Sequence, residues 1–339
     1  MKRVIILIVL SIQFFSVYSQ QVLDQPKEIT YGRKDGMALT MLVQPPAVTS
    51  NGKAIIWVVS AGWTSDFNWI ALFKILTKPL SDRGFTLFFV MHGSQPKYAV
   101  PDAVIDLKRA VRFIRFHAAE YGIDPGNIGI SGASAGGHLS LMIATTGDDG
   151  DPSGKDSVDK VSSRVQAVAC FFPPVDLLNW KSPGDNAVIR REIKEFQAPL
   201  DFVEWNPVTL HYILITDSVK RTEIGRNISP LYFVTSDDPP VLIAHGDADK
   251  LVPLYQSQKM IEKLKEVNVP CELIIKPGAD HGFWNDISVY TTIFADWFDK
   301  HLVTKSDKVN NRNACNFKKF NDFENTKLFV QNRTQLREK

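Results

Sequence analysis

The chain has 339 residues, of which 44% are hydrophobic and 22% charged, which is ordinary for a globular protein that can bury a full core without disulfides. The net charge is +2, but residues 304–339 carry nine basic and four acidic side chains and residues 1–19 add two positive charges, which leaves residues 20–303 at −5. This mildly acidic body argues against a nucleic-acid-binding surface.

The first 19 residues have the layout of a secretory signal peptide. Two basic residues precede the apolar run Val4–Leu10, and small residues bracket Tyr18. The apolar run is shorter than the roughly 20 residues that a membrane-spanning helix needs. We therefore predict removal of residues 1–19 by cleavage near Ser19, a secreted or periplasmic protein, and no stable membrane insertion afterwards.

From residue 28 onward, strand-like and helix-like segments alternate. The predicted strands are apolar through most of their length, as in parallel sheets that are covered on both faces, and the Asp35-Gly36 turn makes the first two a hairpin. The sequence predicts an α/β fold with a mainly parallel central sheet, helices on both faces and an antiparallel edge. The strands are expected at 28–31, 38–43, 54–59, 86–90, 128–131, 165–172, 241–244 and 272–276, and the helices at 69–80, 102–121, from 135, 254–267 and 287–302.

Two segments interrupt this alternation. Residues 174–229 are long, irregular and rich in aromatic side chains, and such a segment usually serves function or forms its own subdomain. We interpret it as a cap-like insert over the pocket of a catalytic domain that spans residues 20–303. Residues 304–339 are basic, contain seven Asn and show little periodicity, which favours a disordered tail.

The string Gly132-Ala133-Ser134-Ala135-Gly136 lies between a predicted strand and an apolar helix. A serine at such a strand-to-helix turn projects from the end of the sheet, and the flanking glycines leave room for the tight backbone. The start of the following helix offers free N–H groups for a developing oxyanion. The context predicts that Ser134 is a catalytic nucleophile.

A serine nucleophile needs a base, and the base needs an orienting carboxylate. Of the seven histidines, His281 follows the last predicted strand, where a loop can carry it over the serine. Asp249 follows the preceding strand and is favoured over Asp247, which is placed to cap a turn, whereas Asp280 adjoins the histidine and points away from it. We predict the triad Ser134, Asp249 and His281, in that chain order.

The second part of the oxyanion hole is expected in the loop after the strand at 54–59. Backbone N–H groups of Ala61 or Gly62, together with that of Ala135, are the candidate donors. Trp63 is either a substrate contact or simple wall packing, and Phe283, just after the histidine, is a second substrate-pocket candidate.

Several motifs accompany the triad: Arg109–Ile114, Tyr121–Pro125, Gly132–Leu139, Asp238–Pro240 with His245–Asp249 and Val252-Pro253, and Gly278–Phe283. Together they resemble the bacterial carboxylesterase branch of the α/β-hydrolases, which includes acetyl-xylan and feruloyl esterase-like members, over roughly residues 28–302. Many relatives carry His-Gly-Gly-Gly where this chain has Ser60-Ala61-Gly62-Trp63, so the oxyanion hole is expected to differ in shape.

The resemblance implies a serine esterase that acts on small-molecule or glycan-linked esters. The predicted secretion adds extracellular plant or algal glycan esters as one class of substrate. A serine peptidase of the prolyl-oligopeptidase type is the alternative, although such enzymes usually carry a large propeller domain. A binding module that has lost activity is a third reading. No motif indicates a metal or other cofactor, since the three cysteines lack zinc-site spacing. Nothing in the sequence indicates an oligomeric state.

Overall fold

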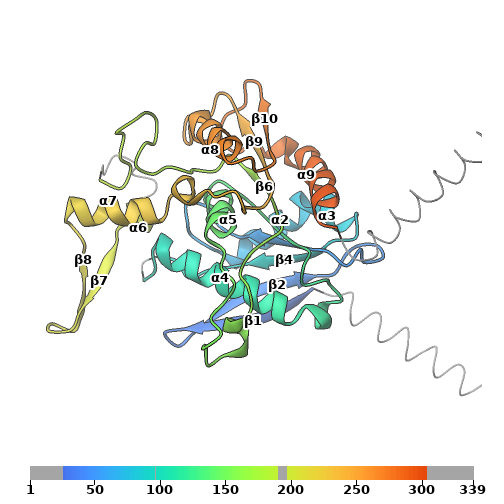
Figure 1. Cartoon of the computed structure of the whole chain (residues 1–339), viewed down its shortest axis with the longest axis horizontal. Coiled ribbons are helices and arrows are strands. Elements are labelled where there is room, and N and C mark those ends of the chain that lie inside the picture. The colour runs from blue at the N-terminus through green and yellow to red at the C-terminus, as the bar shows by residue number, and fades with distance from the viewer. Residues whose placement is uncertain (1–25, 96, 190–196, 304–339) are drawn as a thin grey trace, which may run out of the picture. The chain divides into compact units, whose positions relative to one another are not determined.

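The computed structural model describes residues 26–95, 97–189 and 197–303, and those up to Leu302 form one compact unit (Figure 1). Its main sheet has eight strands in the order β1-β2-β4-β3-β5-β6-β9-β10. β2 is antiparallel to both of its neighbours, whereas every pairing from β4 to β10 is parallel, as predicted. The strands are β1 (Lys27–Lys34), β2 (Met37–Gln44), β3 (Ala54–Val58), β4 (Thr86–Val90), β5 (Ile128–Ala133), β6 (Ala167–Phe171), β9 (Val241–Gly246) and β10 (Cys271–Lys276).

Helices cover both faces of this sheet. α4, α5 and α8 pack on one face and α2, α3 and α9 on the other, and the two layers enclose separate hydrophobic clusters. Alternation along β3 divides its side chains between them: Ile56 and Val58 join the first cluster, and Ile55 and Trp57 the second. The helices are α2 (Ile70–Leu76), α3 (Lys78–Ser81), α4 (Val100–Phe116), α5 (Ala135–Thr146), α8 (Leu254–Glu266) and α9 (Ile287–His301).

Two predicted helices are interrupted. The stretch 69–80 is divided at Thr77, where the chain bends before Pro79, into α2 and α3. In one continuous helix Pro79 would lack the N–H that bonds to the Ile75 carbonyl and its ring would clash there, whereas proline is tolerated in the first turn of a new helix, which is its place in α3. The stretch 102–121 becomes α4 followed by the 3₁₀ turn η2 (Ala118–Tyr121), which ends at Gly122 in a left-handed conformation.

The segment predicted as an insert contains elements of its own. Its described part includes α6 (Gln197–Leu200), α7 (Ser218–Asn227) and a separate hairpin of β7 (Val203–Asn206) and β8 (His211–Leu214). The 3₁₀ turn η5 (Pro230–Phe233) then leads the chain back to β9. The interpretation of this segment as a pocket roof stays a prediction.

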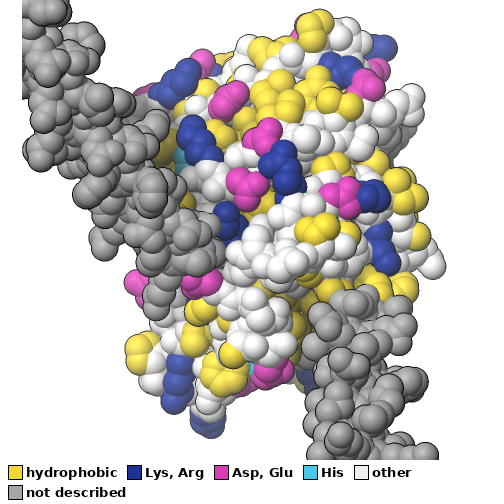
Figure 2. All heavy atoms as spheres, turned by 90° about the vertical axis from the view of Figure 1, so that its right-hand side faces the viewer, with side chains coloured by type: hydrophobic (Ala, Val, Ile, Leu, Met, Phe, Trp, Pro, Cys, Tyr) yellow, Lys and Arg dark blue, Asp and Glu magenta, His cyan; other side chains and the backbone are white. Residues whose placement is uncertain are grey.

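The surface carries charges of both signs. On the face drawn in Figure 2, basic and acidic side chains lie interspersed. Arg83 after α3, for example, pairs with Asp296 and Asp299 of α9. Within the described residues, no helix combines the length and the apolar character needed to cross a bilayer. The predicted signal peptide and the tail 304–339 lie outside the described residues.

The turn from β5 to α5 lies at the carboxyl edge of the sheet and is packed tightly against its neighbours. Ser134 adopts φ 55° and ψ −118°, a left-handed conformation that L-residues rarely adopt, between the last residue of β5 and the first of α5. A Cβ on Gly132 would lie 2.5 Å from the carbonyl carbon of Gly136, and a Cβ on Gly136 would lie 2.7 Å from the carbonyl oxygen of Val58. Only glycine fits at either position.

We expect Gly136→Ala to destabilise the protein by more than about 2 kcal/mol, because the added methyl group would overlap the backbone of β3. Thermal unfolding measures the loss. Gly126→Ala is the matched control, since a Cβ there meets only the Asp124 side chain, at 3.3 Å. Equal unfolding temperatures for the two variants would contradict the packing argument.

Candidate active site

Three side chains from different loops meet at the carboxyl edge of the sheet. His281, in the loop after β10, has its Nε2 3.0 Å from the Ser134 Oγ and its Nδ1 2.7 Å from Oδ2 of Asp249. The serine hydroxyl is half-buried and the Asp249 side chain is fully buried. The structure therefore brings together all three residues that the sequence predicts as a triad.

The hydrogen bonds decide where the imidazole proton lies. An ionised carboxylate only accepts hydrogen bonds, so the Nδ1 of His281 carries the hydrogen that Asp249 receives. Nε2 is then left with its lone pair directed at the Ser134 hydroxyl. This is the tautomer that can remove a proton from the serine.

The Asp249 carboxylate is stabilised in its charged form. Burial alone would raise the pKa of this carboxyl, but hydrogen bonds from His245 and His281 and from the Val252 amide outweigh burial and hold the pKa well below its usual range. Its Oδ1 accepts from the amides of Leu251 and Val252, at 2.9 and 2.8 Å. The loop thus fixes both the charge and the orientation of this side chain.

The alternative carboxylates have other roles. Asp247 accepts the Gly278 amide and so caps the turn that follows β10, as predicted. Asp280 accepts the amides of Lys250 and His281, which directs its carboxylate away from the imidazole ring. Neither competes with Asp249 for the Nδ1 hydrogen of His281.

His245, near the end of β9, also contacts the Asp249 carboxylate. Its Nε2 lies 2.9 Å from the Val252 carbonyl and 3.3 Å from Oδ2 of Asp249, and its Nδ1 lies 2.7 Å from the Ser257 Oγ. Because Val252 and Asp249 present acceptors only, Nε2 carries the hydrogen and the Ser257 hydroxyl donates to Nδ1. A buried donor therefore contacts the same oxygen of Asp249, Oδ2, that His281 binds.

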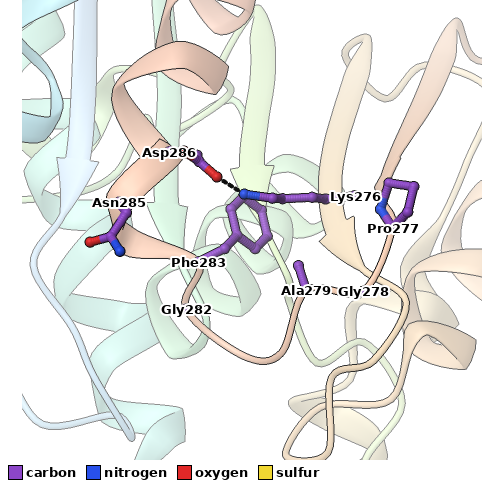
Figure 3. A pocket seen from close by; sticks show the side chains of 8 residues that line it. All are labelled: Lys276, Pro277, Gly278, Ala279, Gly282, Phe283, Asn285 and Asp286. Carbon is purple, nitrogen blue, oxygen red and sulfur yellow. Dashed lines mark ion pairs between the residues drawn. The ribbon is translucent and has the colours of Figure 1, made fainter.

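Aromatic rings enclose one side of His281. Phe172, which follows β6 with φ 36°, meets the imidazole edge-on at 4.6 Å, and Phe283 meets Phe172 at 5.4 Å. Sequence reasoning missed Phe172; its place as the last residue of the predicted strand 165–172 is the one signal that marked it. Phe283 lines a cavity of about 360 Å³ beside the His281 loop (Figure 3). Its contact with substrate stays a prediction.

The hydrogen bonds in the loop after β3 show that one predicted oxyanion donor, the Ala61 amide, is wrong. The Ala61 amide donates to the Thr64 carbonyl at 2.9 Å and the Thr64 amide returns the bond at 3.0 Å, which closes a two-residue turn. Ala61 is therefore not free to bind an oxyanion. Gly62 and Trp63 both have positive φ, 53° and 58°, as a type I′ turn requires. Gly62 and Ala135, the first residue of α5, remain the candidate donors.

The Trp63 side chain is part of the wall. Its indole is 3% exposed, and its Nε1 donates to Nδ1 of His138 at 2.9 Å. His138, on α5, donates from Nε2 to the Ile228 carbonyl at 2.6 Å. A left-handed conformation costs a non-glycine residue about 1 kcal/mol or more, and this buried hydrogen bond helps to hold it. Of the two alternatives for Trp63, the structure favours wall packing over direct substrate contact.

The side chain of Gln256 hydrogen-bonds the start of the insert to the main domain. Gln256 on α8 accepts the amides of Val175 and Asp176 through Oε1 and donates through Nε2 to three carbonyls, the nearest being Trp180 at 2.7 Å. Gln256 is fully buried. The chain segment that leaves β6 beside Phe172 is thus held rigidly next to the candidate site.

The described residues contain no cluster of three or more His, Cys, Asp or Glu side chains that could hold a metal ion. Cys170 on β6 is a buried free thiol, and burial raises its pKa well above the ordinary value. Cys271 is also free, and Cys315 lies outside the described residues.

Comparison with protein families agrees with this arrangement. A family model described as BD-FAE matches residues 41–264, more than half of the chain, and one for the dienelactone hydrolase family matches residues 225–315. The chain belongs to the BD-FAE family. The predicted resemblance to α/β-hydrolase carboxylesterases is thereby confirmed, and so is the fold class.

Individual relatives of this BD-FAE protein are esterases by name. The probable carboxylic ester hydrolase LipM of Mycobacterium tuberculosis is 26% identical over 70% of this chain and 50% of its own. A truncated carbohydrate esterase from gut microbiota is 27% identical with a TM-score of 0.65, over 81% of this chain and 96% of that one. An esterase of Thermogutta terrifontis is 25% identical with a TM-score of 0.62, over 81% and 92%. The chain spans about half the length of the curated relatives it matches.

Two buried histidines make stability depend on pH. Burial lowers the pKa of His138 and of His92 from 6.5 to about 4. Between these values the unfolded chain binds protons that the folded chain does not, so the free energy of unfolding falls as pH drops from 6.5 towards 4. We expect a loss of about 2 to 3 kcal/mol per ring at pH 4.5, measured by urea unfolding at pH 7.5 and 4.5.

His138→Gln isolates one of the two rings. The variant keeps an acceptor for the Trp63 indole but cannot titrate, so its pH-dependent loss should be smaller than the wild type's by about 2 to 3 kcal/mol. His117→Gln is the control, since that ring is hydrogen-bonded to Glu120 at the surface. An unchanged pH dependence in His138→Gln would show that this ring is protonated in the folded protein.

Proposed function

We propose that this chain is a serine esterase that cleaves carboxylic esters through an acyl-enzyme on Ser134 and acts outside the cytoplasm on acyl groups carried by glycans. The observation that supports the proposal is the continuous hydrogen-bonded chain from Asp249 through His281 to the Ser134 hydroxyl, at 2.7 and 3.0 Å. A hydroxyl becomes a nucleophile when a correctly placed base removes its proton, and this geometry provides such a base.

In the first half of the reaction, the Ser134 Oγ attacks the ester carbonyl carbon while Nε2 of His281 takes the hydroxyl proton. The imidazolium that forms is stabilised by the Asp249 carboxylate, whose low pKa keeps it charged. The carbonyl oxygen becomes an oxyanion. His281 then gives its proton to the leaving alcohol oxygen, which departs and leaves the acyl group on the serine.

The oxyanion is stabilised by backbone N–H groups. Ala135 is the first residue of α5, so its amide has no partner within the helix and points along the positive end of the helix dipole. Gly62 supplies the second amide from the type I′ turn. Donors fixed in advance are effective because they need not reorganise as charge develops.

In the second half, water replaces the alcohol. His281 removes a proton from the water as it attacks the acyl carbon, and the same proton returns to Ser134 Oγ when the carboxylic acid leaves. The half-buried serine is reached from solvent, and the imidazole side chain is 17% exposed. Both the ester and the hydrolytic water can therefore approach the same face.

Two observations support glycan-bound esters as the substrate class. A structural relative is named a carbohydrate esterase and covers most of this chain. The first 19 residues have the layout of a signal peptide, which places an enzyme where extracellular glycans are found. Acyl groups on such glycans, acetyl groups first among them, are the proposed targets.

We expect Ser134→Ala to lower the turnover of p-nitrophenyl acetate by several orders of magnitude, because the nucleophile is lost. Steady-state kinetics on the purified protein measures it. Unchanged turnover in this variant would remove Ser134 from the mechanism. Cleavage of proline-containing peptide amides without ester turnover would instead favour a prolyl-oligopeptidase-type peptidase.

We expect Asp249→Asn to lower kcat by roughly 10³ to 10⁴, since an amide favours the wrong imidazole tautomer. Asp247→Asn is the matched control: this residue caps the neighbouring turn, and its variant should retain most of the activity. Equal losses in the two variants would contradict the assignment of Asp249 as the orienting acid.

We expect Trp63→Phe to lower kcat about tenfold with little change in KM, because a loosened Gly62 turn weakens binding of the oxyanion more than of the ester. Trp57→Phe removes an indole N–H that has no hydrogen-bond partner among the described residues, and serves as the control. A rise in KM at constant kcat would point to Trp63 as a substrate contact.

A further inference from the structure

The hairpin of β7 and β8 exposes a continuous apolar face. Within the described residues its two strands pair only with each other, so each keeps one free edge (Figure 1). Residues directly opposite in an antiparallel pair point to the same side, and here Val203 lies opposite Leu214 and Trp205 opposite Tyr212. These four side chains, which we call the hairpin face, are 39 to 57% exposed. In a single chain the hairpin face is therefore in contact with water.

The tip of the hairpin adds two exposed aliphatic side chains. Val208 is 88% and Leu210 65% exposed, and Leu210 has φ 56°, a conformation for which glycine or asparagine is usual. Asn206 holds the tip in this shape: its carbonyl accepts the Leu210 amide at 2.9 Å, and its Oδ1 accepts the amides of Val208 and Thr209. A leucine that is both at positive φ and exposed gains no packing from its own chain, which points to a contact outside it.

The base of the hairpin is fixed, so the hairpin face is presented in one orientation. Arg221 on α7 donates at 2.7 to 3.1 Å to the carbonyls of Val188, Leu200 and Ile215. Its guanidinium also lies over the Phe202 ring, 5.3 Å from the ring centre. Phe202 and Ile215, which flank the two strands, are buried. A surface that is fixed before association loses little entropy when a partner binds.

The hairpin carries almost no charge. Glu204 is the one charged residue among residues 203–214. Its side chain alternates with those of Val203 and Trp205 and so points away from the hairpin face, where Lys220 of α7 pairs with it. Two copies of the hairpin face can therefore approach each other without repulsion between like charges. Segments that bind anionic membranes are rich in Lys and Arg, and residues 203–214 contain neither.

The shape of the hairpin face favours a protein partner over a glycan. The rings of Trp205 and Tyr212 are inclined at 65° with their centres 5.2 Å apart, so they do not form one flat platform for a sugar. Val203 and Leu214 beside them have no side-chain group that could hydrogen-bond to a hydroxyl. An uneven aliphatic and aromatic surface of this kind packs well against a second apolar surface, as two sheets do in a sandwich.

We propose that the hairpin face is the contact surface of a twofold dimer, in which it packs against the same face of a second copy of this chain. The two hairpins then form two layers that bury both apolar faces, with the tips at the margin. A two-stranded hairpin by itself is only marginally stable in water, so its cover must be present wherever the protein is, and a second copy meets that condition. A self-complementary contact of this kind closes after two copies.

The exposed area is sufficient for a dimer. With about 150 to 250 Å² for each large apolar side chain, the exposed fractions of the hairpin face, Val208 and Leu210 correspond to roughly 600 Å² per copy. Two copies together bury roughly 1,200 Å², which is the lower end of the range for specific interfaces. The inference goes beyond the proposed function and is independent of it, since none of these residues takes part in the proposed mechanism.

Sedimentation equilibrium of the purified protein tests the dimer. Because interfaces of this size have micromolar to picomolar affinity, we expect twice the mass of one chain at about 50 µM. Trp205→Glu should raise the dissociation constant of the dimer at least tenfold, since two carboxylates would be buried without partners. Tyr212→Thr should act in the same direction, and because threonine favours strands it keeps the hairpin intact.

Phe67→Glu is the matched control. Phe67 lies in the 3₁₀ turn η1 (Phe67–Trp69), outside the insert, and has the same exposed fraction as Trp205, 50%. This variant should dimerise like the wild type. A wild type that is monomeric at about 50 µM overturns the proposal, and so does a dimer that Trp205→Glu and Tyr212→Thr leave intact. An equal loss in Phe67→Glu also overturns it, because the effect would then follow from added charge at any exposed ring.

Hydrogen exchange locates the interface. Amides of residues 203–214 should exchange at least tenfold more slowly in the wild-type dimer than in the monomer obtained by dilution or by Tyr212→Thr, whereas amides of α8 should exchange equally in both. Equal exchange of the hairpin amides in dimer and monomer overturns the proposal. So does a monomeric wild type whose hairpin becomes protected only when xylohexaose or vesicles of anionic phospholipid are added, since the face then binds that ligand. Neither measurement depends on ester turnover.

Discussion

The candidate site depends on how closely the backbone of the turn at Ser134 approaches its neighbours. Because Gly136 has no side chain, the turn can lie directly against the backbone of β3, and because Gly132 has none, the two ends of the turn can approach each other. The Ser134 amide also donates to the Phe171 carbonyl, at 3.0 Å. Together these contacts force the serine into its left-handed conformation and direct the hydroxyl out of the sheet. They also set the start of α5, and with it the Ala135 amide, beside the loop after β3.

The close approach explains why distant residues cooperate. Once α5 lies against β3, its residue His138 reaches Trp63, and the insert returns over it so that the Ile228 carbonyl accepts the other ring nitrogen. The imidazole of His138 thus joins the turn at Gly62 and Trp63, helix α5 and the insert. A displacement of any one of these three elements would therefore strain the His138 hydrogen bonds that connect it to the other two.

Three histidines have different roles, and in each one the hydrogen-bond partners fix the tautomer. At His138, His245 and His281, one ring nitrogen faces a group that can only accept a hydrogen bond, so the tautomer is fixed by its surroundings. At His138 and His245 the other nitrogen accepts from a buried donor, and the ring is structural. At His281 the other nitrogen meets the serine hydroxyl, which has a proton to lose, and the ring is placed to act as a base.

The sequence by itself determined the order of the main-sheet strands and of the helices that cover them, because apolar periodicity follows from which faces are buried. It indicated Ser134 because a serine flanked by glycines between a strand and a helix fits a tight turn that exposes the hydroxyl. It favoured Asp249 over Asp247 and His281 over its competitors from chain position alone. Only the tertiary structure decided that the Ala61 amide is taken by Thr64, that Trp63 bonds to His138, and that Phe172 meets the imidazole. Those contacts join residues far apart in the chain or depend on the register of a two-residue turn, and neither leaves a periodic trace in the sequence.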